Sequence, residues 1–190
     1  MATTIDPSDD ELAEVLAGEG IAVRRGPVDD VLARFMQVVD EFAPDTVVRL
    51  TGDNPLVDRA TVELTIEGHR ASGADYTTNG LSRRFPYGLN VEVVQSEALR
   101  RLVAMDPTVE EREHVTLGIL RRPESFSTTA VTQDADRSAL RWTVDLPDDL
   151  AWARSVFEEL YPSNPTFGQD DVVALIERRP ELRRTMGEHQ

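Results

Sequence analysis

Two hydrophobic periodicities alternate along the chain, and this alternation constrains the fold more than any other feature of the sequence. In residues 28–42 apolar side chains recur every three or four positions, which predicts a helix with an apolar face made of Val31, Leu32, Phe35, Val38, Val39 and Phe42. Residues 46–50, TVVRL, are β-branched and largely apolar, which is typical of a strand buried on both faces. A second helix is predicted at 59–71. This order indicates an α/β fold.

The rest of the chain continues the alternation. Further strands are predicted at 75–79, 91–94, 126–131 and 139–144, and further helices at 96–104, 109–120, 147–160 and 169–178. The order of the elements predicts a single α/β domain spanning 1–190, with a mostly parallel sheet that becomes mixed toward one edge. The polar, turn-rich segment 80–90, GLSRRFPYGLN, is a candidate functional loop.

Composition excludes several classes of function. The formal net charge is −15, so nucleic acid is not an expected partner, although small anions can bind at a local cluster of arginines. The chain has no cysteine, which excludes disulfides, thiolate nucleophiles and cysteine-bound zinc. All 20 basic residues are arginine, which excludes Schiff-base chemistry on lysine and a Walker-type lysine. No apolar run reaches the ~20 residues of a membrane-spanning helix, so we expect a cytoplasmic protein without a membrane partner.

An acid follows the predicted strand at 46–50. In open α/β sheets, ligands bind beyond the carboxyl ends of the strands, and Asp53 lies just past Leu50 in the stretch RLTGDNPLVD. The same stretch is rich in turn-forming residues. Taken alone, it is explained more simply by an ordinary turn whose Asp or Asn caps the next helix.

A second acid, Asp145 in LRWTVDLPDDL, follows the predicted strand at 139–144. Pro147 suits the first position of a helix, which leaves Asp145 one residue outside the cap, although a shift of one residue would make it an ordinary cap. Two acids at the ends of two core strands can share a divalent ion, because Mg²⁺ takes one or two carboxylates and completes its octahedron with phosphate and water. Spacing alone does not show that Asp53 and Asp145 meet.

Arginine is the natural partner of phosphate and carboxylate groups, because its guanidinium can bind an oxyanion through two hydrogen bonds. The arginines in or beside the loops and strand ends are Arg49, Arg83, Arg84, Arg112 and Arg141. For each one separately, a surface ion pair is the alternative in so acidic a chain. Arg112 belongs to the tripeptide REH near a helix start, where His114 is either a ligand or a partly buried helix residue.

Seven stretches, in order along nearly the whole chain, resemble one family of enzymes. They are RRGPVDDVLARF, VVRLTGDNPLVD, DYTTN, FPYGLNVEVV, EREHVTLGIL, LRWTVDLPDDL and NPTFGQDDVVALIERRPEL. Together they resemble the spore coat polysaccharide biosynthesis protein F family of cytidylyltransferases, which is acylneuraminate cytidylyltransferase-like. The resemblance implies a Rossmann-like nucleotide-diphospho-sugar transferase fold. It also implies that CMP is transferred from CTP to an acidic or amino sugar with release of pyrophosphate, for surface polysaccharide or glycan biosynthesis.

The resemblance also implies roles for individual residues. Asp53 and Asp145 match the acids implicated in holding Mg²⁺ and are the implied catalytic pair. The sugar would face the segment from 79 to 92. The implied substrate-binding residues are Arg49, Asn79, Arg84, Asn90, Glu92, Arg112 and His114. Such a reaction needs alignment and neutralisation of charge rather than a nucleophile from the protein.

Two departures from the family pattern bear on activity. The chain reads GLNVEV where the family usually reads GLDVEV, so Asn90 replaces an acid and cannot supply charge to a metal. Its first residues, MATTIDPSDDELAEVLAGEGIAV, resemble a segment that the family reaches only after a substantial N-terminal portion. That portion carries the first strand and a phosphate-binding loop ending in LPGK. We therefore expect an N-terminally truncated fold that lacks this loop and its lysine.

The isolated chain is accordingly expected to be weak or inactive as an enzyme. A wrongly assigned start codon, a fragment and a shortened homologue with another role all explain its beginning. The alternative function is a non-catalytic homologue that binds a sugar nucleotide or a partner protein, and a homodimer would cover the edge that a missing strand exposes. A glycosyltransferase of related fold fits less well, because Asn54 and Pro55 follow Asp53 where such enzymes commonly have Asp-x-Asp.

Overall fold

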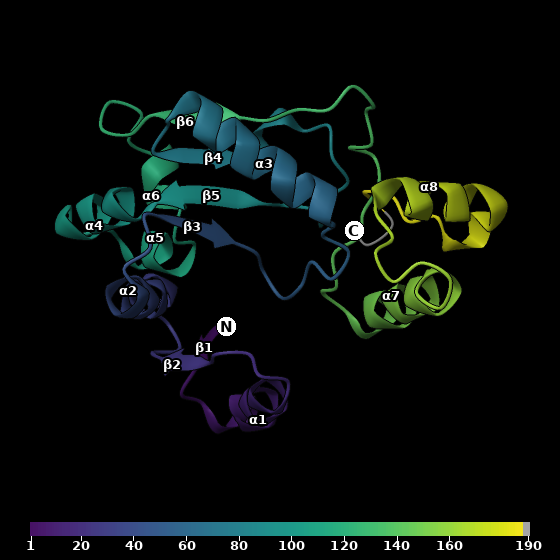
Figure 1. Ribbon diagram of the computed structural model, residues 1–190, viewed down its shortest axis with the longest axis horizontal. Coiled ribbons are helices and arrows are strands. Elements are labelled where there is room, and N and C mark those ends of the chain that lie inside the picture. The colour runs from purple at the N-terminus through teal and green to yellow at the C-terminus, as the bar shows by residue number, and fades with distance from the viewer. Residues whose placement is uncertain (188–190) are drawn as a thin grey trace. The chain divides into compact units, whose positions relative to one another are not determined.

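The computed structural model describes residues 1–187, which form two compact units. The first unit contains residues 1–47 and 94–128, and the second contains residues 48–93 and the chain from residue 129 onward. Figure 1 labels the elements of both units in chain order. The single domain expected over 1–190 stays a prediction.

The first unit combines a small parallel sheet with short helices. Its elements are β1 (Ala2–Thr4), η1 (Pro7–Asp9), α1 (Asp10–Gly18), β2 (Arg24–Gly26), α2 (Val31–Phe42), α4 (Ser96–Ala104), α5 (Val109–Glu113) and α6 (Leu117–Leu120). Strands β1 and β2 pair in parallel, with Thr3 opposite Arg25. Helix α2 packs against both strands. It begins at Asp30, whose side chain accepts a hydrogen bond from the Ala33 N–H at 2.8 Å, and it ends just before Pro44.

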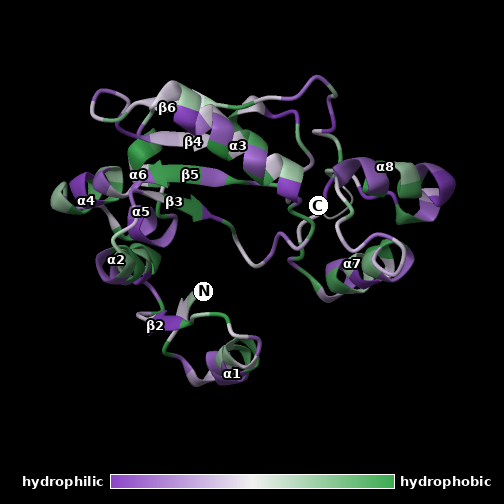
Figure 2. Cartoon of the chain, viewed as in Figure 1, coloured by the Kyte–Doolittle hydropathy of each residue, from purple (hydrophilic) through white to green (hydrophobic). Residues whose placement is uncertain are grey.

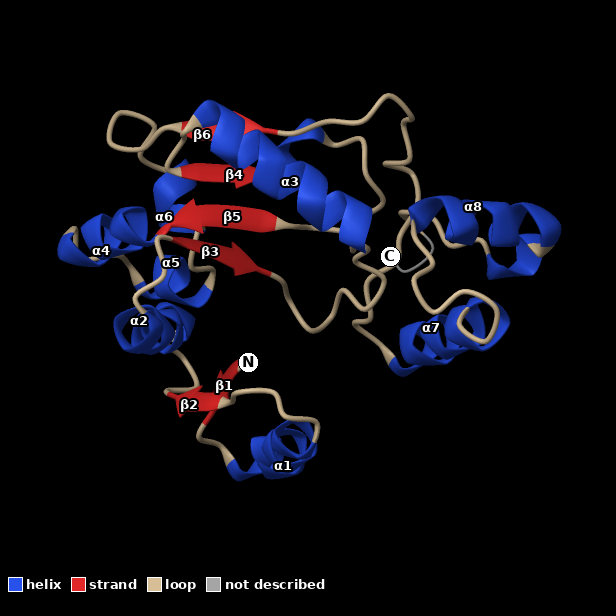
Figure 3. Cartoon of the chain, in the orientation of Figure 1, coloured by secondary structure: helices blue, strands red, loops and turns tan. Residues whose placement is uncertain are grey.

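Most residues of the second sheet belong to the second unit. The elements there are β3 (Thr46–Arg49), α3 (Arg59–Ser72), β4 (Tyr76–Thr78), η2 (Gly80–Ser82), β5 (Glu92–Gln95), β6 (Thr128–Ala130), α7 (Pro147–Leu160), α8 (Gln169–Arg178) and η3 (Pro180–Leu182). The strand order is β3-β5-β4-β6. The arrows in Figure 3 show that β3, β4 and β6 point one way and β5 the other. The expected α/β fold with a mixed sheet is confirmed. Parallel pairing does not predominate in this sheet as predicted, because β5 lies between β3 and β4 and runs opposite to both.

Apolar burial follows the predicted pattern only in part. The prediction that the strand at 46–50 is buried on both faces is wrong, because Val48 is 38% exposed and Leu50 is 49% exposed. Helix α3 packs on β4, and Figure 2 shows bands of hydrophilic and hydrophobic residues along α3 and green, hydrophobic residues in β5. A separate core lies where the chain at 140–142 meets α7 and α8, and its fully buried centre includes Trp142 and Val156. This core anchors the segment that carries Asp145.

Several helix boundaries agree with the sequence. Helices α4, α7 and α8 begin and end at the residues predicted for 96–104, 147–160 and 169–178. Pro147 marks the start of α7. None of the helices within residues 1–187 is both long and apolar enough to cross a membrane.

The predicted helix at 109–120 is wrong as a continuous element. It is divided into α5 and α6, because Val115 takes a φ of 52° and stops the first helix. Positive φ is rare for a β-branched residue, and Val115 is fully buried, so packing imposes the break. Periodicity alone does not reveal such a residue.

The predicted strand at 139–144 is also wrong. The segment makes only isolated bridges, in which Arg141 pairs with Tyr87 in parallel and Leu140 pairs with Thr185 in antiparallel orientation. Its composition suits a strand, but a strand also needs a neighbour that runs beside it for several residues. The segment is instead held by single contacts on both sides.

Candidate active site

Asp53 lies in the turn that follows β3, with its side chain exposed. Within residues 1–187, no group donates a hydrogen bond to its carboxylate. Its backbone carbonyl accepts hydrogen bonds from the Val144 N–H at 2.8 Å and from the Thr143 hydroxyl at 3.2 Å. The cap of α3 is Asp58, which accepts a hydrogen bond from the Thr61 N–H at 2.7 Å. The capping explanation of Asp53 therefore does not apply.

The segment at 142–145 lies against the backbone of Gly88. The Trp142 N–H donates to the Tyr87 carbonyl at 2.6 Å, and Gly88 has a φ of 103°. A Cβ atom at Gly88 would lie 2.5 Å from the Thr143 nitrogen, so only glycine permits this approach. Gly88 of the GLNVEV stretch therefore allows the backbone of residues 142–143, which leads to Asp145, to pack closely against it.

Asp145 keeps part of its carboxylate accessible. Its side chain is 49% exposed, and its Oδ2 accepts a hydrogen bond from Arg141 Nη2 at 2.7 Å. The Thr143 hydroxyl lies 3.3 Å from Oδ1. Because Val144 donates to the Asp53 carbonyl, the chain segments that carry Asp53 and Asp145 are hydrogen-bonded to each other, as the Mg²⁺ hypothesis requires.

Asp149, in the first turn of α7, is the acid that caps this helix. Its side chain is completely buried, and its Oδ2 accepts hydrogen bonds from the N–H groups of Asp145 and Leu146, both at 2.9 Å. Arg141 donates to both oxygens, at 2.9 and 3.0 Å, and Arg184 donates to Oδ1. The hydrogen bonds from Arg141 hold the pKa of the Asp149 carboxyl well below its usual range, despite burial. Asp145 is therefore not needed as a cap.

The donor set of Asp53 and Asp145 fits Mg²⁺. Both groups are oxygen ligands, and the Asp53 carboxylate has no hydrogen-bond partner among the described residues. Over the same part of the chain, no three His, Asp or Glu residues form a group that could hold a metal, so these two acids would supply only part of a coordination shell. Mg²⁺ commonly binds through one or two carboxylates and takes its remaining ligands from phosphate and water.

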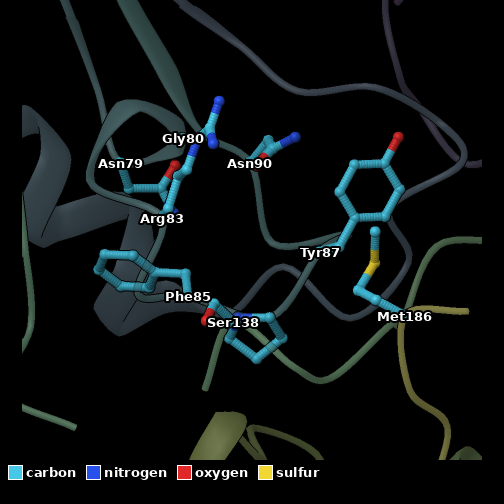
Figure 4. Close-up of a pocket in the computed structure, with 9 residues that line it drawn as sticks. Asn79, Gly80, Arg83, Phe85, Tyr87, Asn90, Ser138 and Met186 are labelled. Atoms are coloured by element: carbon cyan, nitrogen blue, oxygen red, sulfur yellow. The ribbon is translucent and has the colours of Figure 1, made fainter. Parts of the chain in front are cut away.

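A pocket of about 530 Å³ lies in the second unit, beside the predicted functional loop. Figure 4 shows how the side chains of Arg83, Tyr87 and Asn90 lie around it. Its lining residues are Asn79, Gly80, Arg83, Phe85, Pro86, Tyr87, Asn90, Ser138 and Met186. The volume is that of a small-molecule site, and the lining joins aromatic and aliphatic surface to a few polar groups.

Arg83 and Arg84 point to different surroundings. Arg84 donates from Nε to the Gln133 carbonyl at 2.7 Å and from Nη2 to the Asp134 carbonyl, so it holds the loop at 133–134. Arg83 has a φ of 50° and an exposed side chain that lines the pocket. No described residue forms an ion pair or hydrogen bond with its guanidinium. The geometry therefore favours Arg83 over Arg84 as the ligand-binding arginine.

The two predicted asparagines differ in availability. Asn79 is completely buried, and its amide donates to the Leu89 carbonyl at 2.7 Å and accepts from the Val91 N–H at 2.8 Å. It supports the wall of the pocket by holding the segment at 89–91 that leads to β5. Asn90 is exposed, and no hydrogen bond occupies its side chain in the described chain. Of the two, Asn90 is the one whose amide can reach a ligand.

Arg49 and Glu92 form an ion pair with each other. Both side chains are largely buried, and Tyr76 donates its hydroxyl to the second oxygen of Glu92 at 2.6 Å. Neither residue lines the 530 Å³ pocket. This arrangement fixes the carboxyl end of β3, just ahead of the Asp53 turn.

Arg112 and His114 belong to the first unit. Arg112 donates from Nη1 to Asp30 at 2.7 Å, and Asp30 also caps α2, so this arginine ties α5 to the start of another helix. His114 ends α5 and is exposed. The ion-pair explanation applies to Arg112 in the structure.

Comparison with known proteins adds to this geometry. Residues 2–156 match the model of the family described as cytidylyltransferase. The chain belongs to the cytidylyltransferase family. This agrees with the resemblance found in the seven sequence stretches.

Individual relatives agree with this membership. The chain is 29% identical over 186 residues to the spore coat polysaccharide biosynthesis protein SpsF of Bacillus subtilis, in a match that covers 95% of this chain and 75% of that protein. It is 27% identical over 187 residues to an uncharacterised protein of Methanocaldococcus jannaschii, covering 96% of this chain and 74% of the other. A cytidylyltransferase structure from Leptospira borgpetersenii superposes with a TM-score of 0.88 at 24% identity, covering 98% of this chain and 79% of that one, which shows the same fold.

Sequence reasoning missed part of the candidate site. Arg83 was only one of several arginines, and its orientation depends on a positive φ that the sequence does not announce. Asp149 resembles any acid in a first helical turn, and Arg184 carries no signal because it lies in an ordinary-looking segment after α8. Arg141 donates hydrogen bonds to both Asp145 and Asp149, and only the structure shows that both acids lie within its reach.

Proposed function

We propose that the chain transfers CMP from CTP to a hydroxyl group of a sugar acid, with release of pyrophosphate. The observation that carries the proposal is the hydrogen bond between the Asp53 carbonyl and the Val144 N–H, because it joins the segments of the two acids. Membership of the cytidylyltransferase family supports the same reaction. The printed name of the Bacillus subtilis relative supports a role in polysaccharide biosynthesis.

In this proposal Asp53 and Asp145 hold Mg²⁺. The ion, when bound, neutralises charge on the phosphates of CTP and on the departing pyrophosphate. The sugar oxygen attacks the α-phosphorus, the bond from that phosphorus to the pyrophosphate oxygen breaks, and the hydroxyl proton is released to solvent. The protein's own contribution is alignment. Gly88 and Thr143 fix the backbone ahead of Asp145, and the Arg49–Glu92 pair fixes the chain ahead of Asp53.

The pocket beside the loop is the proposed sugar site. Its lining contains one cation, Arg83, and no carboxylate, which favours an acidic sugar over an amino sugar. Arg83 would bind the sugar carboxylate through two hydrogen bonds. Asn90 would donate to or accept from a hydroxyl group, and Tyr87 and Met186 would contact apolar substituents. Contacts of Arg84, Arg112 and His114 with substrate stay predictions.

The test is a product assay on the whole chain. The protein is incubated with CTP, Mg²⁺ and either a 2-keto sugar acid or an amino sugar, and pyrophosphate and the CMP-sugar are measured by coupled assay and mass spectrometry. We expect product with the sugar acid, at the low rate expected for the isolated chain, and none with Asp53→Asn, which keeps the shape of the side chain and removes its charge. Product from the amino sugar alone would contradict the assigned sugar class. The absence of both turnover and Mg²⁺-dependent CTP binding would favour the non-catalytic alternative.

A further inference from the structure

Arg141 contacts two carboxylates that have different environments. Its Nη2 donates to Asp145 at 2.7 Å and to Asp149 at 3.0 Å, and its Nη1 donates to Asp149 at 2.9 Å. The pair with Asp149 is therefore two-pronged and buried, whereas the pair with Asp145 is single and half exposed. Since paired hydrogen bonds from a guanidinium are the stronger arrangement, Arg141 is oriented chiefly by Asp149.

Asp149 also holds the backbone on which Asp145 sits. An acid at this helical position ordinarily reaches back to one N–H, that of the capping residue. Here one oxygen of Asp149 accepts from two, Leu146 and Asp145, both at 2.9 Å. The second hydrogen bond fixes the Asp145 peptide itself, which a helix cap does not require.

The charge of Asp149 matters as much as its hydrogen bonds. Arg141 and Arg184 both donate to it, so it offsets two cations beside the proposed metal ligand. Without that negative charge, Arg141 would pair with Asp145 alone. A divalent ion would then compete with Arg141 for Asp145 and would meet the repulsion of both guanidinium groups.

We propose that Asp149 is a positioning residue for the metal site, which holds Asp145 through its backbone N–H and limits how far Arg141 neutralises the Asp145 carboxylate. This inference rests on the proposed function, because it requires Asp145 to bind Mg²⁺. It assigns to Arg184 the opposite role. Arg184 also forms an ion pair with Asp149, so it weakens the attraction between Asp149 and Arg141 and leaves Arg141 freer to pair with Asp145.

The experiment measures Mn²⁺ binding to the full 190-residue chain, from the loss of the free-ion signal in electron paramagnetic resonance, with Mg²⁺ as competitor. Asp149→Asn should raise the Kd for Mn²⁺ by about tenfold or more, as is typical when a residue that orients a metal ligand is changed. Asp148→Asn is the matched control. It removes the same charge from the same helical turn and should change the Kd by less than about threefold, because the effect of an exposed charge is screened.

Arg184→Gln separates positioning from a merely structural role. The variant should be less stable, because Arg184 also stacks over Trp152 at 5.8 Å, yet its Kd for Mn²⁺ should fall by about twofold. If Asp149 and its arginines served only to stabilise the fold, the less stable Arg184→Gln variant would bind Mn²⁺ equally well or more weakly than wild type. The Arg184→Gln measurement therefore tests the positioning role even if Asp149→Asn does not fold.

The outcomes distinguish the two proposals. If the wild-type chain binds no Mn²⁺ that Mg²⁺ displaces, or if Asp53→Asn binds as well as wild type, the metal site itself is wrong. If wild type binds Mn²⁺ through Asp53 while Asp149→Asn binds equally tightly, the metal site stands and the positioning role is overturned. Unchanged or weaker binding by Arg184→Gln overturns the positioning role as well.

Discussion

Asp58 accepts a hydrogen bond from the backbone N–H of Gln169, 111 residues further along the chain, at 2.7 Å. Its other oxygen accepts from the Thr61 N–H, also at 2.7 Å, so one carboxylate caps both α3 and α8. Gly168 leaves room for this contact, since a Cβ there would lie 2.9 Å from Asp58 Oδ2. The stretch that contains Asp53 is thereby tied to the start of α8.

We expect Asp58→Ala to destabilise the protein by about 2 kcal/mol or more, because the loss of one capping side chain typically costs about 1 kcal/mol and Asp58 caps two helices. In a domain of this size, each kcal/mol lowers Tm by roughly 2–4 °C. Urea unfolding and thermal unfolding both measure the loss.

Asp58→Asn is the control for this prediction, because its single carbonyl oxygen can cap one helix only. Its stability should fall between those of wild type and Asp58→Ala. Equal stability of Asp58→Ala and wild type would show that the double cap contributes nothing.

The neighbouring arginines of the loop provide a matched pair. Arg83→Gln should weaken binding of a sugar acid by about tenfold, because it removes the cation that faces the pocket, and should leave CTP binding unchanged. Arg84→Gln should leave sugar binding nearly unchanged and lower stability, since Arg84 holds the carbonyls of Gln133 and Asp134. Calorimetric titration of each variant with sugar acid measures both. The reverse ranking of the two variants would restore Arg84 as the ligand-binding arginine.

The limits of sequence reasoning in this chain have physical causes. Helix α7 was predicted to the residue, because Pro147 is a local start signal. Helix α8 was also predicted to the residue, although its first N–H group donates to Asp58, which is distant in the sequence. The strand at 139–144 was wrong because strand formation depends on a partner, and Tyr87 and Thr185 offer only single bridges. The break at Val115 and the turn at Arg83 depend on positive φ values that tertiary packing stabilises.

In the candidate site, too, some features could be predicted from sequence position and others required the structure. Asp53 and Asp145 were proposed from their places after apolar segments, and the hydrogen bond between Asp53 and Val144 brings those segments together. The choice between Arg83 and Arg84 needed the direction of each side chain. A pattern of residue types carries no information about direction once the chain leaves a regular helix or strand.

Ligand-induced stabilisation tests the metal-dependent nucleotide site without turnover. At 100 times its Kd, a ligand adds about 2.7 kcal/mol, which for a domain of this size raises Tm by roughly 5–10 °C. We expect such a shift with CTP and Mg²⁺ together, and only a small one with CTP alone. Asp53→Asn should lose the Mg²⁺-dependent part while unfolding at the wild-type temperature without ligand, because its carboxylate has no hydrogen-bond partner among residues 1–187. An unchanged Mg²⁺ effect in this variant would exclude Asp53 as a ligand.

Buried His69 predicts how stability depends on pH. It is 3% exposed in α3, its Nδ1 lies 3.1 Å from the Thr77 hydroxyl, and no described group bonds its Nε2. Burial lowers the pKa of His69 below its usual value, because the charged ring would lose its hydration. In the unfolded chain the ring takes a proton as the pH falls below about 6.5, whereas in the folded chain it stays neutral until a lower pH. The free energy of unfolding should therefore decrease as the pH falls through this range.

The variant His69→Asn isolates this contribution, because asparagine can keep the hydrogen bond to Thr77 and does not titrate. We expect it to be less stable than wild type at pH 7, and the difference in the free energy of unfolding to narrow as the pH falls from 7 to 5.5. Urea unfolding at both pH values measures the difference. If wild type and His69→Asn differed in free energy of unfolding by the same amount at both pH values, His69 would bind a proton as readily in the folded protein as in the unfolded chain.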